Sequence, residues 1–387
     1  MAARTRGPVF VGSAFVAQYP AGGGNFWVPA QYVLGLRALG IEAYWLELLW
    51  TRDRARAAEF VATFRAHVEQ LGLAPWTTLV VLPGERDDPP GRPLEQYGMS
   101  ADDLRARARD ALLVNLANSV TAPLRTPFAR TALLDLDPGP FQLWAREHDL
   151  GVGGHDVHLT IGRNLGAPDS PVPVGAVAWY RVWPAVHLAS WPEQGDAPAA
   201  PYTTVTQWWT NQYAFLDGET YDCNKRPGFV EMIDLPHRVA VALELAANLH
   251  PGETDDRALL ARHGWALVDP AAVAGTPNAF RRYVQRSRGE FSCAKPAYVK
   301  ARPGWVSDRT ICYLASGRPC VVQATGAENH LPASAGLRFF RSLDEASDAI
   351  AAVEADYTTA ARAARRLAED VFATDVVLPD LLAAAGA

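Results

Sequence analysis

The sequence predicts an α/β protein with two doubly wound domains that face a cleft. Segments with the pattern of strands alternate with segments with the pattern of helices through both halves of the 387 residues. This alternation is typical of parallel sheets covered by helices. The chain is also too long for one ordinary core, so two domains of about 150 to 200 residues are expected. We see no repeat with a period of about 20 to 50 residues, which argues against a solenoid.

Composition narrows the class of protein. Hydrophobic residues make up 49% of the chain and charged residues 20%, as in soluble globular proteins. The formal charge is −6 and long Lys/Arg runs are missing. A general nucleic-acid binder is therefore not expected, although a local basic patch stays open. The cysteines show neither a CxxC nor a Cys/His ligand pattern, which favours a reducing, cytoplasmic location; they are Cys223, Cys293, Cys312 and Cys320.

The N-terminal region predicts a βαβ unit. Its basic and apolar start resembles a short signal peptide, but it continues into a glycine-rich loop, so we interpret it as the first strand. The apolar segments of the chain are too short to span a bilayer. The predicted elements are a strand over 8–17, a loop over 17–27, a helix over 29–39 and a strand over 41–49. The loop holds Gly22, Gly23, Gly24 and Asn25 at the carboxyl end of the first strand, where open α/β sheets bind ligands. A flexible turn is the alternative to phosphate binding.

The rest of the first half continues this alternation. We predict helices over 55–71 and 100–111, strands over 78–82, 112–116 and 130–136, and a loop over 85–98. The strand over 130–136 leads to Asp135 and Asp137, whose side chains point the same way because they are two residues apart. Three interpretations stay open: a divalent metal site, a metal-free role for Asp137, or capping of the strand end.

A glycine-rich loop over 151–156 leads into a strand that carries His158. The loop contains His155 and Asp156. Histidine titrates near neutral pH and is the usual general base, and a neighbouring carboxylate can orient it. The alternative is that these polar side chains cap backbone groups of the loop.

The second half is separated from the first by a stretch rich in Pro, Gly and Trp over 167–201. We place the first domain at 1–185, a linker at 186–201 and the second domain at 202–387, with a last helix able to pack back on the first domain. The strand over 202–209 contains Trp208 and Trp209, which suit a core or a sugar-stacking platform. Further strands are predicted over 265–268 and 337–341, and helices over 255–263, 277–285, 343–369 and 375–385.

The most informative stretch is a β-loop-α-β unit over 289–326. Ser307 is a good N-cap of its helix, and Asp308 suits the positive end of the helix dipole. The following amides, with Arg309 and Thr310 beside them, could hold an anion such as a phosphate. Gly304 allows close backbone approach, and Trp305 offers a flat face.

These segments resemble the nucleotide-sugar glycosyltransferases with two Rossmann-like domains, the GT-B architecture. The similarity is greatest to bacterial group-1-like glycosyltransferases and runs over nearly the whole chain. The stretch from Gly304 to Gly326 follows their motif G-W-x-S-D-R-x-x-C-Y-L-A-S-G-R-P-V-V-x-Q-x-T-G almost throughout. More modest matches are Q-Y-x-L-G-L-R-x-L-G over 31–40, D-x-D-P-G over 135–139 and the loop into T-I-G-x-N over 155–164.

The resemblance implies that the second domain binds the sugar nucleotide, with UDP or dTDP as its nucleotide, and that the first binds the acceptor. It implies a cytoplasmic enzyme, a monomer or homodimer, that transfers a hexosyl or pentosyl group without a metal or cofactor. A helix N-terminus would stabilise the charge on the departing diphosphate. The implied donor-binding residues are Gly23, Gly24, Asn25, Lys295, Trp305, Ser307, Asp308, Arg309, Thr310, Thr325, Gly326, Glu328 and Asn329.

The resemblance also leaves the catalytic base open. In the best-known inverting relatives a His after the first strand is the base, whereas this loop offers Gln18 and Tyr19. The candidate catalytic residues are therefore Asp137, His155 and Asp156, and a retaining enzyme needs no protein base. Two alternatives stay open beside transfer to a small-molecule acceptor: transfer to a hydroxylated base in DNA or RNA, and a non-catalytic sugar-nucleotide-binding protein. A two-domain NAD enzyme is disfavoured because a GxGxxG motif followed by an acidic residue is missing.

Overall fold

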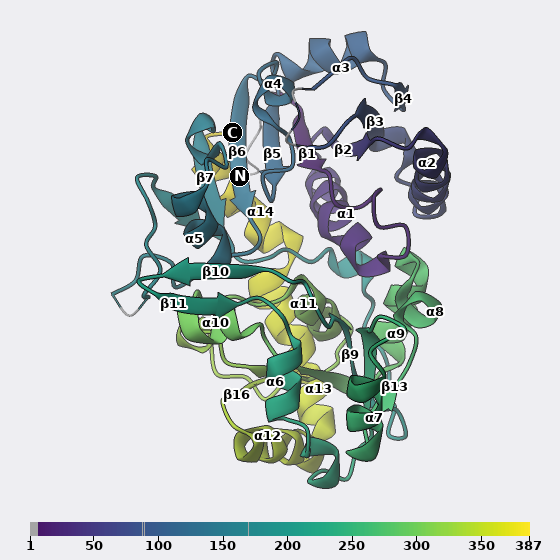
Figure 1. Ribbon diagram of the computed structural model, residues 1–387, viewed down its shortest axis with the longest axis vertical. Helices are drawn as coiled ribbons and strands as arrows, with labels where there is room; N and C mark the ends of the chain where they lie inside the picture. Colours follow the sequence, from purple (N-terminus) through teal and green to yellow (C-terminus); the bar gives the residue numbers. More distant parts are fainter. Residues whose placement is uncertain (1–6, 87, 89, 169) are drawn as a thin grey trace.

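The computed structural model describes residues 7–86, 88, 90–168 and 170–387. It has two lobes, each built around a sheet (Figure 1). The sheet of the first lobe has the order β4-β3-β2-β1-β5-β6-β7-β8, and only its edge pair β3–β4 is antiparallel within the described residues. Its strands are β1 (Val9–Ser13), β2 (Ala43–Thr51), β3 (Thr77–Pro83), β4 (Glu95–Tyr97), β5 (Leu112–Leu116), β6 (Arg130–Asp135), β7 (Val157–Thr160) and β8 (Trp179–Arg181).

The second sheet is parallel and has the order β13-β12-β9-β14-β15-β16. Its strands are β9 (Tyr202–Gln207), β12 (Leu243–Asn248), β13 (Ala266–Leu267), β14 (Gly289–Ser292), β15 (Cys320–Gln323) and β16 (Leu337–Phe340). In both sheets the strand order reverses near the centre, at β1/β5 and at β9/β14. The predicted doubly wound α/β architecture is therefore confirmed, and such reversal points are where open sheets bind ligands.

Helices cover both sheets (Figure 1). In the first lobe they are α1 (Gly23–Ala38), α2 (Arg54–Gln70), α3 (Ala101–Ala108), α4 (Ala122–Arg125) and α5 (Pro140–Glu147). In the second they are α6 (Arg226–Glu231), α7 (Thr254–Arg262), α8 (Pro270–Ala274), α9 (Pro277–Arg286), α10 (Pro296–Ala301), α11 (Asp308–Ala315), α12 (Leu343–Ala355) and α13 (Tyr357–Leu367). Ser307 accepts a hydrogen bond from a first-turn amide, as its predicted cap position requires, and Ser100 and Ser342 cap α3 and α12 in the same way. Among the described residues, we find no helix with the length and apolar character needed to cross a membrane.

The chain passes between the lobes twice, and the two passages are hydrogen-bonded to each other. The Val186 amide donates to the Phe372 carbonyl at 2.8 Å, and the Thr374 amide donates to the Val186 carbonyl at 3.0 Å. The second passage follows a π-helical turn, η6 (Ala368–Phe372), and leads into α14 (Thr374–Ala385). Helix α14 packs against α1 of the first lobe, where the C-terminal end of the chain also lies (Figure 1). The numerical domain limits stay a prediction.

Three elements differ from the prediction. Helix α1 begins at Gly23, six residues before the predicted start at 29, so its glycines form the first helical turn rather than a loop. The polar stretch before α6 forms a hairpin, β10 (Tyr213–Leu216) and β11 (Glu219–Asp222), because Asp217 and Gly218 both adopt positive φ in its two-residue turn. The long helix predicted over 343–369 is interrupted at Asp356, whose carboxylate caps α13.

The hairpin connects the two lobes. The Trp144 indole of α5 donates to the Tyr213 carbonyl at 2.8 Å, and Lys300 of α10 forms an ion pair with Glu219 at 2.6 Å. Trp208 and Trp209, which follow β9, have different environments. Trp208 is fully buried in the core, whereas Trp209 is half-buried beside the cleft described next.

Candidate functional site

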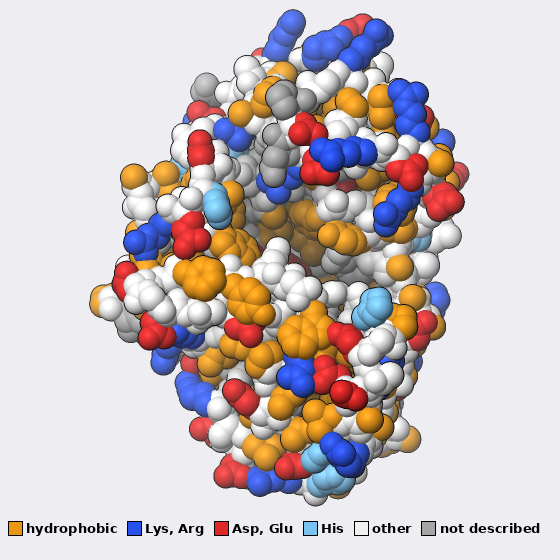
Figure 2. All heavy atoms as spheres, viewed as in Figure 1, with side chains coloured by type: hydrophobic (Ala, Val, Ile, Leu, Met, Phe, Trp, Pro, Cys, Tyr) orange, Lys and Arg blue, Asp and Glu red, His pale blue; other side chains and the backbone are white. Residues whose placement is uncertain are grey.

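A cleft of about 920 Å³ separates the lobes, and Figure 2 shows this face of the molecule hollowed between them. It lies where β1 and β9 end, at the carboxyl edges of the two sheets, as expected for ligand sites of open α/β sheets. The first lobe contributes the β1–α1 loop and the start of α1, while the second contributes the end of β9 and the start of α11. Polar lining residues include Gln18, Asn25, Gln31, Arg56, Thr206, Gln207, Thr210, Gln212, Asn248, Asp269, Ser307, Asp308 and Arg309.

Two helix N-termini border this cleft. Helix α11 starts after Ser307, whose hydroxyl accepts a hydrogen bond from the Arg309 amide at 3.2 Å. Helix α1 starts at Gly23, and Gly23, Gly24 and Asn25 all line the cleft. Helix N-termini favour anions through their unpaired amides and the helix dipole. The predicted donor-binding residues around Ser307 and those around Gly23 therefore lie on opposite walls of one cleft.

The glycines of α1 also have a packing role. A Cβ at Gly23 would collide with the Thr276 carbonyl oxygen, and one at Gly24 would lie 3.0 Å from the Phe280 ring. Their missing side chains let α1 approach the second lobe closely, and the Trp27 indole donates to the Pro277 carbonyl at 2.9 Å in the same contact. The glycine run therefore serves the interface between the lobes as well as the lining of the cleft.

Arg309 lines the cleft, but three of its N–H groups face the protein. They donate to Glu290 at 2.6 Å, to the Val205 carbonyl at 2.8 Å and to the Ser292 hydroxyl at 2.6 Å. The Glu290 side chain is fully buried, so the arginine compensates its charge. The geometry thus gives Arg309 a structural role that the sequence did not predict.

Asp308 lies at the positive end of α11. Burial raises the pKa of its carboxyl group to about 6. Thr310, two residues further along α11, is buried and does not line the cleft. Asp308 is therefore an acidic group of the cleft whose charge changes close to neutral pH.

Lys225 is a buried cation beside this wall that the sequence analysis missed. Burial, with the charges of Arg309 and Lys295 after it, lowers the pKa of its ammonium group to about 7. Its Nζ lies 5.9 Å from the centroid of the Trp305 ring. Three cations, Lys225, Lys295 and Arg309, thus gather close to the end of β9. Lys225 was not predicted because it lies in a polar stretch without clear hydrophobic periodicity, directly before the short, proline-containing helix α6.

Asp137 and Lys295 meet across the lobes. Lys295 Nζ lies 2.9 Å and 3.2 Å from the two Asp137 carboxylate oxygens, and the Tyr298 hydroxyl also donates to Asp137. These residues lie at the carboxyl ends of β6 and β14. The structure therefore brings a candidate from the first domain together with one from the second.

The two carboxylates of the D-x-D sequence have different partners. Asp135 is buried and accepts hydrogen bonds from Gln142 and Thr160, each at 2.8 Å, and from the Asp137 amide at 2.9 Å. Burial raises its pKa to about 6. Asp135 thus caps the strand end, one of the three predicted alternatives, while Asp137 is directed to Lys295. This arrangement does not favour a shared metal ion.

His155 and Asp156 precede β7, at the amino edge of the first sheet and outside the cleft lining. The His155 ring contacts the Asn115 amide nitrogen at 2.9 Å, and burial, followed by the Arg125 charge, lowers its pKa to about 4. Asp156 accepts hydrogen bonds from the Thr131 amide and hydroxyl at 2.7 Å and 2.9 Å. The structure does not bring this pair together with Asp137, and the contacts match the predicted alternative of loop capping.

The loop after β15 is tied to Trp305. The Thr325 hydroxyl donates to the Trp305 carbonyl at 2.6 Å, and the Gly326 amide donates to Glu328 at 2.9 Å, with Gly326 at a φ of +91°. Glu328 pairs with Arg341 at 2.7 Å, and Asn329 is exposed. The Trp305 ring lies tilted beside Tyr298 with centroids 4.5 Å apart. The residues predicted to bind the donor in this loop are thus connected to Trp305 but are not among the lining residues of the cleft.

Two further residues position the cleft, and neither was predicted as a site residue. Glu47 is fully buried and accepts hydrogen bonds from the Val16 and Ala17 amides at 2.8 Å and 2.9 Å, so it fixes the β1–α1 loop. Gln31 of α1 lies 3.8 Å from the Cys312 sulfur of α11 and accepts from Trp191 at 3.0 Å. The sequence signal for Glu47 was a lone carboxylate inside the apolar strand β2.

Comparison with known proteins identifies the fold. No family model and no curated protein matches the chain, whereas solved structures do. An α-glucosyltransferase in complex with UDP is 10% identical, with a TM-score of 0.59, and the match covers 98% of this chain and 100% of that one. HepE from Anabaena, in complex with UDP and glucose, is 12% identical, with a TM-score of 0.54 and coverage of 97% and 98%. Sucrose-phosphate synthase from Thermosynechococcus elongatus is 13% identical, with a TM-score of 0.53 and coverage of 98% and 97%.

These neighbours are GT-B glycosyltransferases. The chain therefore has the GT-B fold, and the predicted resemblance is confirmed at the level of the fold. The same architecture explains why both ligand-binding edges face one cleft.

Proposed function

We propose that the protein is a glycosyltransferase that moves a hexosyl or pentosyl group from a nucleoside-diphosphate sugar to a small-molecule acceptor. The observation that carries the proposal is the cleft of the GT-B fold, which is lined by the N-terminus of α11 and by Arg309, with the cations Lys225 and Lys295 near Arg309 but outside the lining. The neighbours solved with UDP, and with UDP and glucose, support a uridine nucleotide as the donor nucleotide, with a dTDP sugar as the alternative.

The proposed chemistry follows from the charges. As the anomeric C–O bond breaks, negative charge grows on the departing diphosphate, and groups already aimed at that charge stabilise it. We assign this role to the α11 amides and to Lys225, since a bound diphosphate favours the charged form of a lysine whose pKa has been lowered to about 7. Arg309 adds its positive charge while remaining bonded to Glu290.

We assign Asp137 to the acceptor side of the reaction. It is the one of the three catalytic candidates that lies at the carboxyl edge of the first sheet, whereas His155 and Asp156 lie at the amino edge. Its contact with Lys295 fixes a carboxylate of the first lobe against a cation of the second. We therefore propose that this pair sets the distance between acceptor and donor, which leaves inversion or retention of the anomeric centre open to experiment.

A thermal-shift panel of nucleoside diphosphates and their sugars tests the proposal. A ligand that binds only the folded state raises its stability, so we expect UDP or dTDP and their sugars to raise the melting temperature, and NAD to leave it unchanged. Release of the nucleoside diphosphate in the presence of an acceptor then distinguishes an enzyme from a protein that only binds the nucleotide. A panel without any shift at millimolar ligand would contradict the proposed function.

Chelation tests the metal-free mechanism. Because helix amides and lysines can stabilise the leaving group without a metal, we expect turnover to survive EDTA. The measurement is the rate of nucleotide release before and after chelation, with added Mg²⁺ as the control. If EDTA abolishes turnover and Mg²⁺ restores it, the mechanism is wrong and the acidic pair Asp135 and Asp137 is the first place to look.

Transfer to a base in DNA is the second candidate, because one neighbour is an α-glucosyltransferase in complex with DNA that contains a modified base. The local basic patch that the sequence left open would consist of Arg105, Arg107 and Arg109, of which Arg105 is paired with Asp102 and Arg107 with Glu42. Together with the formal charge of −6, this pairing favours a small-molecule acceptor. Addition of duplex DNA to the nucleotide-release assay distinguishes the two.

A further inference from the structure

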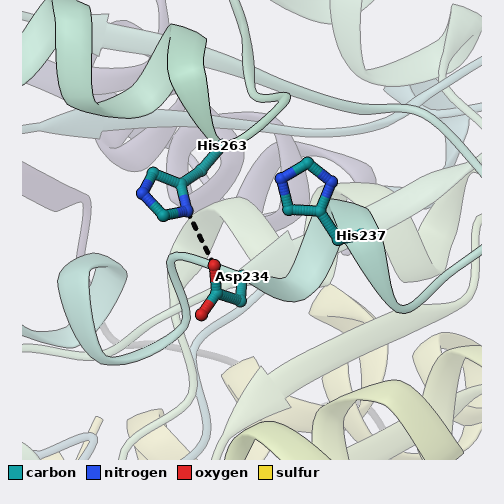
Figure 3. A group of neighbouring side chains, drawn as sticks. All are labelled: Asp234, His237 and His263. Atoms are coloured by element: carbon teal, nitrogen blue, oxygen red, sulfur yellow. Dashed lines mark hydrogen bonds and ion pairs between the residues drawn. The ribbon is translucent and has the colours of Figure 1, made fainter.

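Three metal-ligating side chains meet on the second lobe, outside the cleft lining. Asp234 precedes the short helix η4 (Leu235–His237), His237 ends it, and His263 follows α7 (Figure 3). Each offers one ligand atom, and these atoms all lie within 4.8 Å of one another. The closest pair is His263 Nδ1 and Asp234 Oδ1, at 2.7 Å. A shared metal ion would hold all three ligand atoms at about 2.0 to 2.2 Å, so the side chains must draw together to bind it.

The backbone beneath this cluster is fixed. The Trp265 indole, two residues after His263, donates to the Ile233 carbonyl at 2.9 Å and so joins the two segments that carry the ligands. Leu235 is fully buried between them. Gly264 adopts a φ of +84°, and a Cβ there would lie 3.3 Å from the Pro236 side chain, so the segments are closely packed. The ligands are therefore held on rigid backbone, as preformed sites require.

The ligand types select the class of metal. Two imidazoles and one carboxylate suit a first-row transition ion such as Zn²⁺, whereas Mg²⁺ and Ca²⁺ prefer oxygen ligands only. Three protein ligands leave a fourth tetrahedral position for water. The neighbouring cation Arg238 is paired with Asp344, which offsets its charge near the site.

We propose that Asp234, His237 and His263 form a binding site for a zinc-like divalent ion that is separate from the catalytic cleft. The ion cross-links η4 to the end of α7. The site is independent of the proposed function, because none of its ligands lines the cleft.

Isothermal titration of Zn²⁺ into the full-length, chelator-treated protein tests this site. We expect saturable binding of one ion per chain, and no saturable binding of Mg²⁺. The variants His263→Ala and His237→Ala should each bind Zn²⁺ at least about tenfold more weakly, because even the outer partners of metal ligands typically contribute that much. His148→Ala is the matched control, since His148 is another exposed histidine, at the end of α5, and this variant should bind as the wild type does.

Two results would overturn the proposal: wild-type protein without saturable Zn²⁺ binding, or His263→Ala and His237→Ala variants with the affinity of the His148→Ala control. Circular dichroism checks that each variant is folded. If an alanine variant does not fold, His263→Gln and Asp234→Asn retain hydrogen-bonding side chains of similar size and give the same comparison.

Discussion

Replacing Arg309 by Met should lower the free energy of unfolding by about 3 to 5 kcal/mol, because it leaves the carboxylate of Glu290 buried without its partner. The arginine side chain is only 12% exposed, so water cannot take over its role. Urea unfolding followed by tryptophan fluorescence measures the change.

The matched control for this variant is Arg341→Met. Arg341 also pairs with a glutamate, Glu328, but its side chain is 55% exposed. Such a pair contributes less than about 1 kcal/mol. The double variant Arg309→Met with Glu290→Gln should be less destabilised than the sum of the single variants, since it removes the buried charge as well. If Arg309→Met unfolds like the wild type but loses nucleotide affinity, the arginine acts on the ligand and not on Glu290.

Replacing Lys225 by Met should weaken binding of the donor nucleotide by about 1.5 to 3 kcal/mol, the contribution of a hydrogen bond to a charged group. The binding should also depend on pH. Burial, followed by Arg309 and Lys295, lowers the pKa of Lys225 to about 7, so the free protein loses this charge as the pH rises through that value. A bound diphosphate favours the charged form and raises the pKa.

The affinity of the wild type for the nucleotide should therefore fall as the pH rises from about 7 to about 9. The Lys225→Met variant should not show the decrease in affinity that comes from loss of the lysine charge. Calorimetric titration with UDP at several pH values measures both effects. Lys300→Met is the control, because Lys300 is an exposed lysine on α10 that pairs with Glu219 away from the cleft. Equal affinity and equal pH dependence in Lys225→Met and Lys300→Met would exclude Lys225 from the site.

Much of the fold could be predicted from the sequence, because strands and capped helices leave local signals. The strand over 112–116 and the cap at Ser307 are examples, since each depends on neighbouring residues alone. The hairpin was missed although Asp217-Gly218 is a strong turn signal, because its flanking strands carry exposed residues such as Tyr213 and Phe215. The start of α1 was missed because glycine has a low helix propensity, which tertiary packing overrides here.

The site was less accessible to prediction, because it depends on contacts between residues far apart in the chain. Lys225 and Arg309 are far apart in the sequence and come close only in the folded chain. Asp137 likewise meets Lys295 across the two lobes. Conversely, the adjacent residues His155 and Asp156 suggested a catalytic pair. They directly precede the first residue of β7, however, so they lie at the amino edge of the sheet and not at the edge that borders the cleft. Sequence patterns identify residues capable of chemistry, whereas topology decides which of them share a cleft.

The paired passages between the lobes limit how the cleft can open. Because Val186 is hydrogen-bonded to Phe372 and Thr374, both connections must bend at one level. The two passages therefore form one bonded connection, and a sliding motion of one passage along the other would break the bonds between them. The π-helical turn η6 ends at Phe372, one of the bonded residues, and such turns are frequent at functional sites. Any opening of the cleft would therefore bend both passages at this one level, and α14 returns the second passage to the first lobe.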